Sequence, residues 1–370
     1  MTVTRVRVRQ SDGVLWVGEP PAHAEWTALV EAGGAVLSWD VPAGQRLPSA
    51  EVYRPWQAAD WLWQVYGPAA ETLLAVPDGT ETEIELPDAG GPLADAVARL
   101  ALLGWLAAWW PASYVAGVPA LSAALLAAEQ AVAAAEVESL LDDEDAVTRL
   151  LARAAPAVHP LAALADHPRL GAEATRLADR LADVADTFGV ELPAPAALVA
   201  DQTGWALAAG GQPPGGVTAL GGGGPLDWCW LPPGVVDAAA GLRWSLVRRD
   251  GRLLLEVSVA RAPVAFAERV RSWPLRARSD AVEFPLAVSP EGGAFSGATE
   301  LPPTALLVPA PRRTVTVWAP GFADPDEPPV PPAELAGRQE PVLSAARERL
   351  AATDVSFAER VATLVDPEAG

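Results

Sequence analysis

A stretch without any charged residue, residues 100–128, constrains the fold of this chain more than any other feature. A segment this apolar is either buried or crosses a membrane, and a spanning helix needs about 20 apolar residues. Pro111, Gly117 and Pro119 interrupt the stretch, and a proline inside a helix removes a hydrogen bond and clashes with the preceding turn. We therefore expect two buried helices joined by a tight connection. The alternative is a membrane hairpin with paired tryptophans at the interface, but no stable membrane insertion is expected.

The helical pattern extends over residues 91–200, where alanine and leucine dominate. One amphipathic segment has its apolar side chains at helical spacing along one stripe: Ala174, Leu177, Leu181, Val184 and Phe188. Prolines and an acidic run divide the region. The pattern predicts a helical bundle of about four helices.

Residues 1–90 alternate between strand-like and helix-like patterns. The order β-β-α-β-α-β-β predicts a small α+β domain. We expect helices over residues 22–31 and 56–66, and strands near residues 73–76 and 82–86.

Residues 227–320 have the pattern of short strands separated by proline and glycine turns. Asp250 and Gly251 lie between two alternating runs, which is the strongest hairpin signal in the chain. About seven strands in this length predict an immunoglobulin-like β-sandwich. The fold class is thus multi-domain α+β, with an N-terminal α+β unit, a helical middle region and this C-terminal sandwich.

Two proline-rich segments flank the predicted sandwich. Residues 201–226 are so rich in glycine that we expect a linker without regular structure, and no phosphate-binding motif follows it. Residues 321–370 begin with an acidic, proline-rich connector that should be extended. The connector is followed by two predicted helices, over residues 332–351 and 355–365.

Lysine and asparagine are absent, and all 26 basic residues are arginine. With one isoleucine as well, this composition is typical of a G+C-rich genome such as those of actinobacteria. The absence of lysine excludes a P-loop, a Schiff base, a pyridoxal anchor and a protein-kinase site. The serine hydrolase elbow and the dinucleotide-binding fingerprint are missing too. We expect no cofactor, and these absences favour a protein that is not an enzyme.

The cysteine content and the N-terminus predict a cytoplasmic protein. The single Cys229 excludes internal disulfides and multi-cysteine metal sites. The first residues lack the pattern of a secretory signal.

The net charge of −21 argues against nucleic acid as a partner of the whole molecule, because phosphates would be repelled. Residues 228–320 differ, with 11 arginines and 8 acidic residues. The plain interpretation is a mildly basic domain. The alternative is an arginine-bearing face, with Arg248 and Arg249 as candidates, that binds an acidic surface or ligand.

Few polar residues are candidates for a catalytic or metal-binding role. His159, Asp166 and His167 are weak candidates for metal ligands, since each histidine precedes a proline and no second cluster completes a ligand set. The carboxylates of residues 136–145 lack the glycine and spacing of a calcium loop and should form a solvated helix junction. Cys229, between two tryptophans, is expected to be a buried, inert thiol at the start of a strand.

Tryptophans cluster in two segments, and we single out Trp56, Trp63, Trp105 and Trp109 as candidate binding residues. Aromatic clusters stack on flat ligands and anchor protein interfaces. The alternative is that tryptophan fills ordinary cores in place of phenylalanine and tyrosine. Exposure of several indoles on one surface would favour binding.

Three functions remain open. The first is a non-catalytic interaction or accessory protein in a larger cytoplasmic assembly, with a protein partner still to be identified. The second is an enzyme of unfamiliar type, such as a hydrolase, with its site near His159 and His167. The third is a small-molecule or carbohydrate binder that uses the tryptophan-rich segments.

Overall fold

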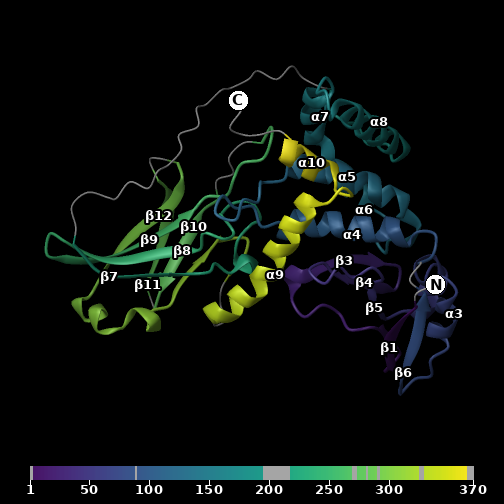
Figure 1. Ribbon diagram of the computed structural model, residues 1–370, viewed down its shortest axis with the longest axis horizontal. Helices are drawn as coiled ribbons and strands as arrows, with labels where there is room; N and C mark the ends of the chain where they lie inside the picture. The colour runs from purple at the N-terminus through teal and green to yellow at the C-terminus, as the bar shows by residue number, and fades with distance from the viewer. Residues whose placement is uncertain are drawn as a thin grey trace. The chain divides into compact units, whose positions relative to one another are not determined.

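The computed structural model describes residues 3–87, 90–194, 217–268, 273–280, 282–289, 292–324 and 329–364 (Figure 1). The chain divides into two compact units. Unit 1 comprises Met1–Ala108, Leu121–Leu198 and Arg347–Gly370, and unit 2 comprises Trp109–Ala120 and Val199–Ala346. The short segment Trp109–Ala120 therefore belongs to unit 2, although the chain on both sides of it belongs to unit 1.

Unit 1 contains a six-stranded antiparallel sheet of order β3-β4-β5-β2-β1-β6. Its strands are β1 (Val3–Ser11), β2 (Val14–Val17), β3 (Thr27–Ala32), β4 (Ala35–Asp40), β5 (Ser49–Val52) and β6 (Thr80–Pro87). The edge strand β6 carries glutamates, and two of them pair with arginines of β1: Arg5 with Glu85 at 3.1 Å and Arg7 with Glu81 at 3.3 Å. Charged side chains of this kind discourage pairing with another chain at a sheet edge.

Two elements predicted within residues 1–90 are wrong. The helix predicted over residues 22–31 is a single 3-10 turn, Ala24–Trp26, followed by β3. Exposed and buried side chains alternate along β3, which is the period of a strand. The strand predicted near residues 73–76 overlaps α3 (Ala69–Leu74), a helix that Gly67 separates from the preceding one with a φ of +58°.

The segment predicted as a helix over residues 56–66 forms two short helices, α1 (Pro55–Ala58) and α2 (Trp63–Tyr66). The strand predicted over residues 82–86 lies within β6.

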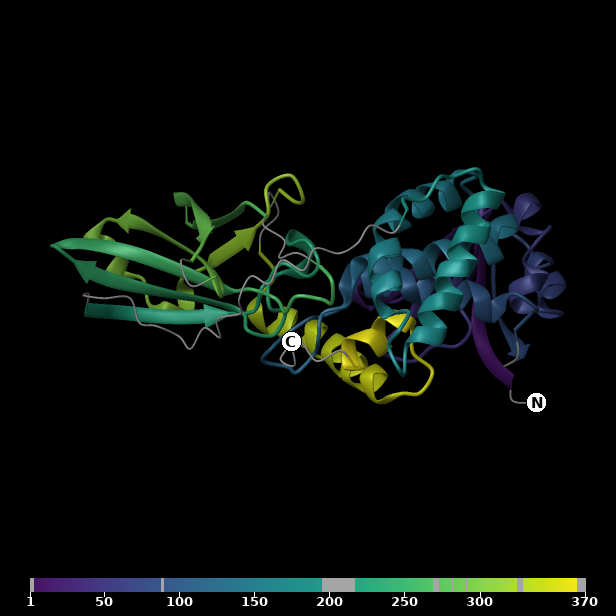
Figure 2. The ribbon, with the colours of Figure 1, turned by 90° about the horizontal axis from the view of Figure 1, so that it is seen from above.

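Helices in the middle of the chain confirm the predicted helical region. They are α4 (Ala94–Trp109), α5 (Ala123–Glu136), α6 (Ala146–Ala154), α7 (Val158–Leu164) and α8 (Gly171–Thr187). The uncharged stretch forms the end of α4, a connection and the start of α5, as expected from its prolines. Figures 1 and 2 show these helices gathered beside the first sheet. Within the described residues, no helix is long and apolar enough to cross a membrane.

Unit 2 contains a seven-stranded antiparallel sheet of order β13-β10-β11-β12-β9-β8-β7. Its strands are β7 (Val217–Gly224), β8 (Leu242–Arg249), β9 (Arg252–Ala260), β10 (Leu275–Ser279), β11 (Val282–Val288), β12 (Ala294–Leu301) and β13 (Val315–Trp318). The predicted hairpin at Asp250 and Gly251 joins β8 to β9, and both residues have positive φ. All seven strands belong to one curled sheet, whereas a sandwich has two, so the structure does not confirm the immunoglobulin-like assignment.

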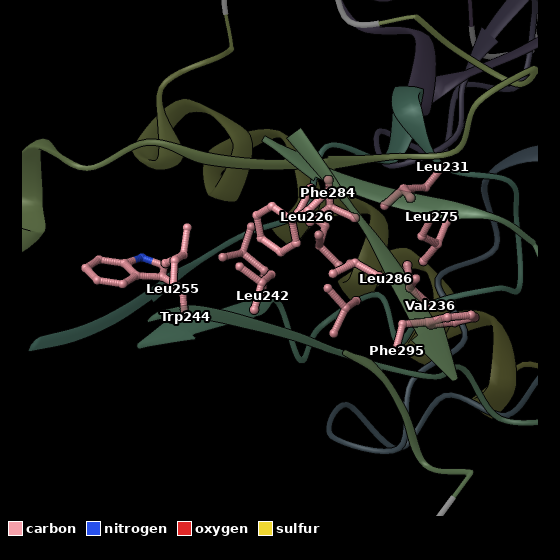
Figure 3. Close-up of a cluster of buried hydrophobic side chains, with 14 of the residues drawn as sticks. Leu226, Leu231, Val236, Leu242, Trp244, Leu255, Leu275, Phe284, Leu286 and Phe295 are labelled. Atoms are coloured by element: carbon pink, nitrogen blue, oxygen red, sulfur yellow. The ribbon is translucent and has the colours of Figure 1, made fainter. Parts of the chain in front are cut away.

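The core of unit 2 is a cluster of buried side chains that come mostly from the strands of this sheet (Figure 3). Phe295 is fully buried, and Phe284 and Leu255 pack in the same cluster. Figure 3 shows Trp244 at one end of this cluster and Phe295 at the other. Both residues are buried members of this cluster.

Part of the predicted linker over residues 201–226 is instead a strand. Residues 201–216 lie outside the described residues, whereas Val217–Gly224 form β7 and pair with β8. Glycine is required at one position of β7, because a Cβ on Gly222 would lie 2.7 Å from Cζ2 of Trp244. The missing side chain thus leaves room for the indole, and glycine here serves close packing inside a strand.

Replacement of Gly222 by valine should destabilise unit 2 by about 1–3 kcal/mol, because Trp244 must move to admit the new side chain. Gly224→Val is the matched control, since a Cβ there meets nothing within 4 Å. Urea unfolding of both variants checks the expectation. Equal stability of the two variants would show that the indole has free space beside β7.

The predicted tail helices are present as α9 (Pro332–Ala351) and α10 (Phe357–Leu364). Ser356 and Glu359 form a capping box at the start of α10, with Ser356 N donating to the carboxylate and Glu359 N donating to the hydroxyl. The carboxylate of Glu129 on α5 accepts the next two amides, Phe357 N at 2.7 Å and Ala358 N at 3.0 Å. All the amides that α10 leaves free at its start therefore have acceptors.

Candidate functional site

The two end strands of the curled sheet, β7 and β13, border a common cavity of about 220 Å³. Gly223 and Gly224 of β7 line it on one side, and residues 315–317 of β13 line it on the other. We call this opening between β7 and β13 the seam.

No strand fills the seam among the residues that the structure describes. β7 pairs only with β8, and β13 pairs only with β10. Each strand therefore turns one row of backbone N–H and C=O groups away from its sheet. Such rows are templates for pairing with another extended segment.

The β7 edge lacks the usual protection against pairing. Its sequence VTALGGGG contains no charged residue and no proline, in contrast to the glutamate-bearing edge β6 of unit 1. Gly223 and Gly224 have no side chains, so a ligand can approach their backbone closely. The β7 edge is thus less protected against pairing than the β6 edge, and it borders a cavity.

Two tryptophans line the cavity. Trp244 of β8 lies against Gly222, and its ring centroid is 5.6 Å from the guanidinium carbon of Arg313, within cation–π range. Trp230 belongs to the 3-10 turn Trp228–Trp230, which the carboxylate of Asp227 caps by accepting Cys229 N at 3.0 Å. Ala319 N also donates to Trp230 O at 3.0 Å, which fixes this turn next to β13.

Arg313 has an incomplete set of partners. Its side chain has 0% exposure, and its Nη2 donates to Ala305 O at 2.5 Å. Nη1 lies 4.0 Å from the Asp280 carboxylate, and neither Nε nor Nη1 has a hydrogen-bond partner among the residues that the structure describes. A buried donor without an acceptor is unfavourable by about 1–3 kcal/mol. Arg313 is therefore a buried cation whose guanidinium is closed off from the cavity.

The remaining wall comes from the start of α9 and the connector before it. Pro329, Val330 and Pro331 line the cavity, and Leu335 is buried behind them. Gln339 anchors this part of α9, since its Nε2 donates to Leu226 O at 2.6 Å in the interior of unit 2. A proline-rich segment of the chain thus lies opposite the two tryptophans.

The volume decides what the cavity can hold. Sites for cofactors and drug-sized ligands measure about 300–1,000 Å³. At about 220 Å³ this cavity is smaller, and it is suited to one or two side chains of a larger ligand whose backbone runs along the seam.

The tryptophans that the sequence singled out lie in different environments. Trp105 is buried, and its Nε1 donates to Glu25 O at 2.9 Å, so it is a core residue. Trp109 is half-buried. Trp56 and Trp63 are 74% and 51% exposed on α1 and α2. Of the four tryptophans, only Trp56 and Trp63 are exposed enough to bind a ligand through an open indole face.

The histidines take part in local structure. His159 is half-buried in the first turn of α7, where proline at the next position is tolerated. Within the described part of the chain its Nδ1 has no hydrogen-bond partner. Nδ1 of His167 accepts the amides of Arg169 and Leu170 before α8, and Asp166 is exposed. Across the described ranges, no group of three or more His, Cys, Asp or Glu residues could hold a metal ion.

The other candidates from the sequence are placed as follows. Cys229 is exposed, which overturns the expected buried thiol, because it lies in a surface 3-10 turn and not at the start of a strand. Arg248 is exposed on β8, and Arg249 pairs with Glu256 at 2.9 Å. The acidic run after α5 contains Glu138–Leu140 as a 3-10 turn.

The residues that build the seam carry no pattern that sequence reasoning could have recognised. Arg313 and Trp244 are 69 residues apart in the chain, and only the folded sheet brings them into contact. The glycine run was the one available signal, since glycine inside a strand often marks close approach of another backbone. Comparisons with protein-family models, with curated proteins and with solved structures found no match.

Proposed function

We propose that unit 2 is a binding module for an extended polypeptide segment, and that the chain is a non-catalytic interaction protein of a cytoplasmic assembly. The observation that carries this proposal is the seam itself: two unpaired strand edges border one cavity. A segment that enters the seam can hydrogen-bond to the backbone of β7 or β13, while one of its side chains fills the cavity. This is recognition by strand addition, in which main-chain bonds supply affinity and pockets supply specificity.

Several features support a peptide over a small substrate. The cavity is below the usual volume for a cofactor or metabolite. Its walls are mainly tryptophan, leucine, valine and proline residues, with Asp227 and two threonines, and the side chain of its one arginine is buried. Such walls provide apolar contact and shape but no arranged acid, base and nucleophile.

Selection from a displayed library of random twelve-residue peptides tests this function, with the whole chain as the target. The discriminating variant is Gly224→Leu, which places a side chain in the seam without a clash, because a Cβ there meets nothing within 4 Å. The matched control is Gly104→Leu on α4, where a Cβ also meets nothing within 4 Å.

We expect peptides with micromolar Kd for the wild type and for Gly104→Leu, and at least tenfold weaker binding to Gly224→Leu. Circular dichroism should show that both variants are folded. Selected peptides that bind Gly224→Leu as well as they bind the wild type would refute the seam as the binding site. A selection that enriches no peptide would refute the proposed function.

A further inference from the structure

Asp227 is the accessible charged residue in the wall of the seam cavity. Two charged residues line the cavity, Asp227 and Arg313. The side chain of Arg313 has 0% exposure, whereas Asp227 is half-buried. A charged group of a ligand that enters the cavity can therefore reach the carboxylate of Asp227 but not the guanidinium of Arg313.

The carboxylate of Asp227 has room for a further donor. Its Oδ1 accepts Cys229 N at 3.0 Å, which caps the turn that carries Trp230. Among the residues that the structure describes, no arginine forms an ion pair with Asp227. A carboxylate offers about four acceptor positions on its two oxygens, so one amide leaves most of them unused. A cation of the ligand would supply the missing partner.

The other walls of the cavity suit a long aliphatic stem. Trp230 is half-buried there, and Leu242, Val315 and Pro331 add apolar surface. Arginine and lysine combine an apolar stem with a cationic head, so they can bury the stem on apolar surface and keep the head at a polar group. Cationic groups also pack favourably on tryptophan rings. One such side chain matches both the apolar walls and the carboxylate.

The charges of unit 2 do not oppose a basic ligand. Unit 2 contains 12 arginines and 15 aspartates and glutamates, a net charge of −3, and the whole chain carries −21. Arginines of the sheet pair with glutamates of the same sheet: Arg249 with Glu256 at 2.9 Å, Arg252 with Glu300 at 3.4 Å and Arg278 with Glu283 at 2.6 Å. The net negative field of the protein thus favours the approach of a basic segment.

From these observations we infer that the ligand of the seam is a basic extended segment, in which one arginine or lysine side chain enters the cavity and pairs with Asp227. This inference rests on the proposed function and specifies its ligand. The stem of the basic residue lies against Trp230, and the backbone of the segment pairs with the free edge of β7 or β13. Strand addition supplies affinity, and Asp227 selects the side chain.

Two variants of the full chain test the role of Asp227. Asp227→Asn removes the charge but retains an oxygen that can accept Cys229 N, so the turn should remain capped. The matched control is Asp250→Asn, which removes one negative charge from the same unit at the β8–β9 turn. Asp250 has a φ of +51°, a conformation that asparagine tolerates.

The probes are the peptides that the library selection yields against the wild type. We expect arginine or lysine to be enriched at one position of these peptides. Fluorescence anisotropy of a labelled peptide should show at least tenfold weaker binding to Asp227→Asn, because the cation loses its charged partner, and less than a twofold change for Asp250→Asn. A peptide with methionine in place of the basic residue should bind the wild type at least tenfold more weakly, and it should bind Asp227→Asn equally well.

Two results would overturn the inference. One is a set of selected peptides without an enriched basic residue. The other is equal affinity of the basic peptide for the wild type and for Asp227→Asn. If those peptides still lose affinity in Gly224→Leu, the proposed function stands and only the ligand class is wrong, whereas a selection that enriches no peptide would remove both.

Discussion

Replacement of Asp237 by alanine is expected to destabilise unit 2 by about 3–5 kcal/mol, because each buried donor that loses its acceptor is unfavourable by about 1–3 kcal/mol. Asp237 is 1% exposed, and its carboxylate accepts four hydrogen bonds. Oδ1 accepts Ser113 Oγ at 2.6 Å and the amides of Ala239 and Ala240 at 3.1 and 2.9 Å, and Oδ2 accepts Tyr114 N at 2.8 Å. Alanine leaves all four donors without their acceptor.

The effect should be large because Asp237 joins segments that are distant in sequence. Its carboxylate holds the Trp109–Ala120 segment within unit 2, together with the bond from Ala238 N to Ala112 O at 3.1 Å. Urea unfolding monitored by tryptophan fluorescence measures the loss. Ser113→Ala is the control and should lose less, about 1–3 kcal/mol, since it removes the two hydrogen bonds of the hydroxyl, to Asp237 and from Ala116 N. If Asp237→Ala and the wild type unfold at the same urea concentration within error, Asp237 does not hold the Trp109–Ala120 segment as described.

Glu129 should make the stability of unit 1 depend on pH near neutrality. Burial raises the pKa of this carboxyl to about 7, against the opposing effect of the amides of Phe357 and Ala358. Arg360 lowers the pKa and Glu359 raises it, and these two side chains are themselves paired, Arg360 with Glu173 and Glu359 with Arg349. The positive charge of Arg360 is thus shared between Glu173 and Glu129.

The sign of the effect follows from proton binding. The unfolded chain releases the Glu129 proton near a pKa of 4.5, whereas the folded chain keeps it to a pKa of about 7. Between these values the folded state binds more protons, so its stability falls as the pH rises, by an amount on the order of 3 kcal/mol for this group. From about one pH unit above the folded pKa this contribution no longer changes.

Glu129→Gln isolates this contribution, because the other carboxylates titrate equally in both proteins. We expect the difference in unfolding free energy between the wild type and Glu129→Gln to change progressively from pH 4.5 to 7.5 in urea titrations. Glu138→Gln, on the 3-10 turn after α5, is a control that should leave the pH profile unchanged. A difference between wild type and Glu129→Gln that is constant over this range would contradict the raised pKa of Glu129.

The helical middle region and the tail helices could be predicted because their signals are local. Pro111 and Pro119 break the uncharged stretch between α4 and α5, and Pro332 begins α9 where proline is preferred. The Asp250–Gly251 turn is another local signal, and the hairpin between β8 and β9 forms there. These patterns require no knowledge of distant residues.

The errors arise where distant contacts decide the structure. The glycines of β7 form a strand because β8 offers a partner and Trp244 needs the space beside Gly222. Residues 27–31 extend as β3 because β4 pairs with them, although a helix was predicted there. The seam depends in the same way on the curl of seven strands, so no local pattern could place Arg313 and Trp230 around one cavity.

Backbone hydrogen exchange tests the central claim most directly, because strand addition must protect particular amides. The measurement compares the full chain alone with the chain saturated by a peptide from the library selection. We predict slower exchange confined to β7 and β13, with β6 of unit 1 unchanged, and no such protection in Gly224→Leu. Peptide binding that leaves β7 and β13 unprotected, or that protects another surface, would contradict the seam as a site of strand addition.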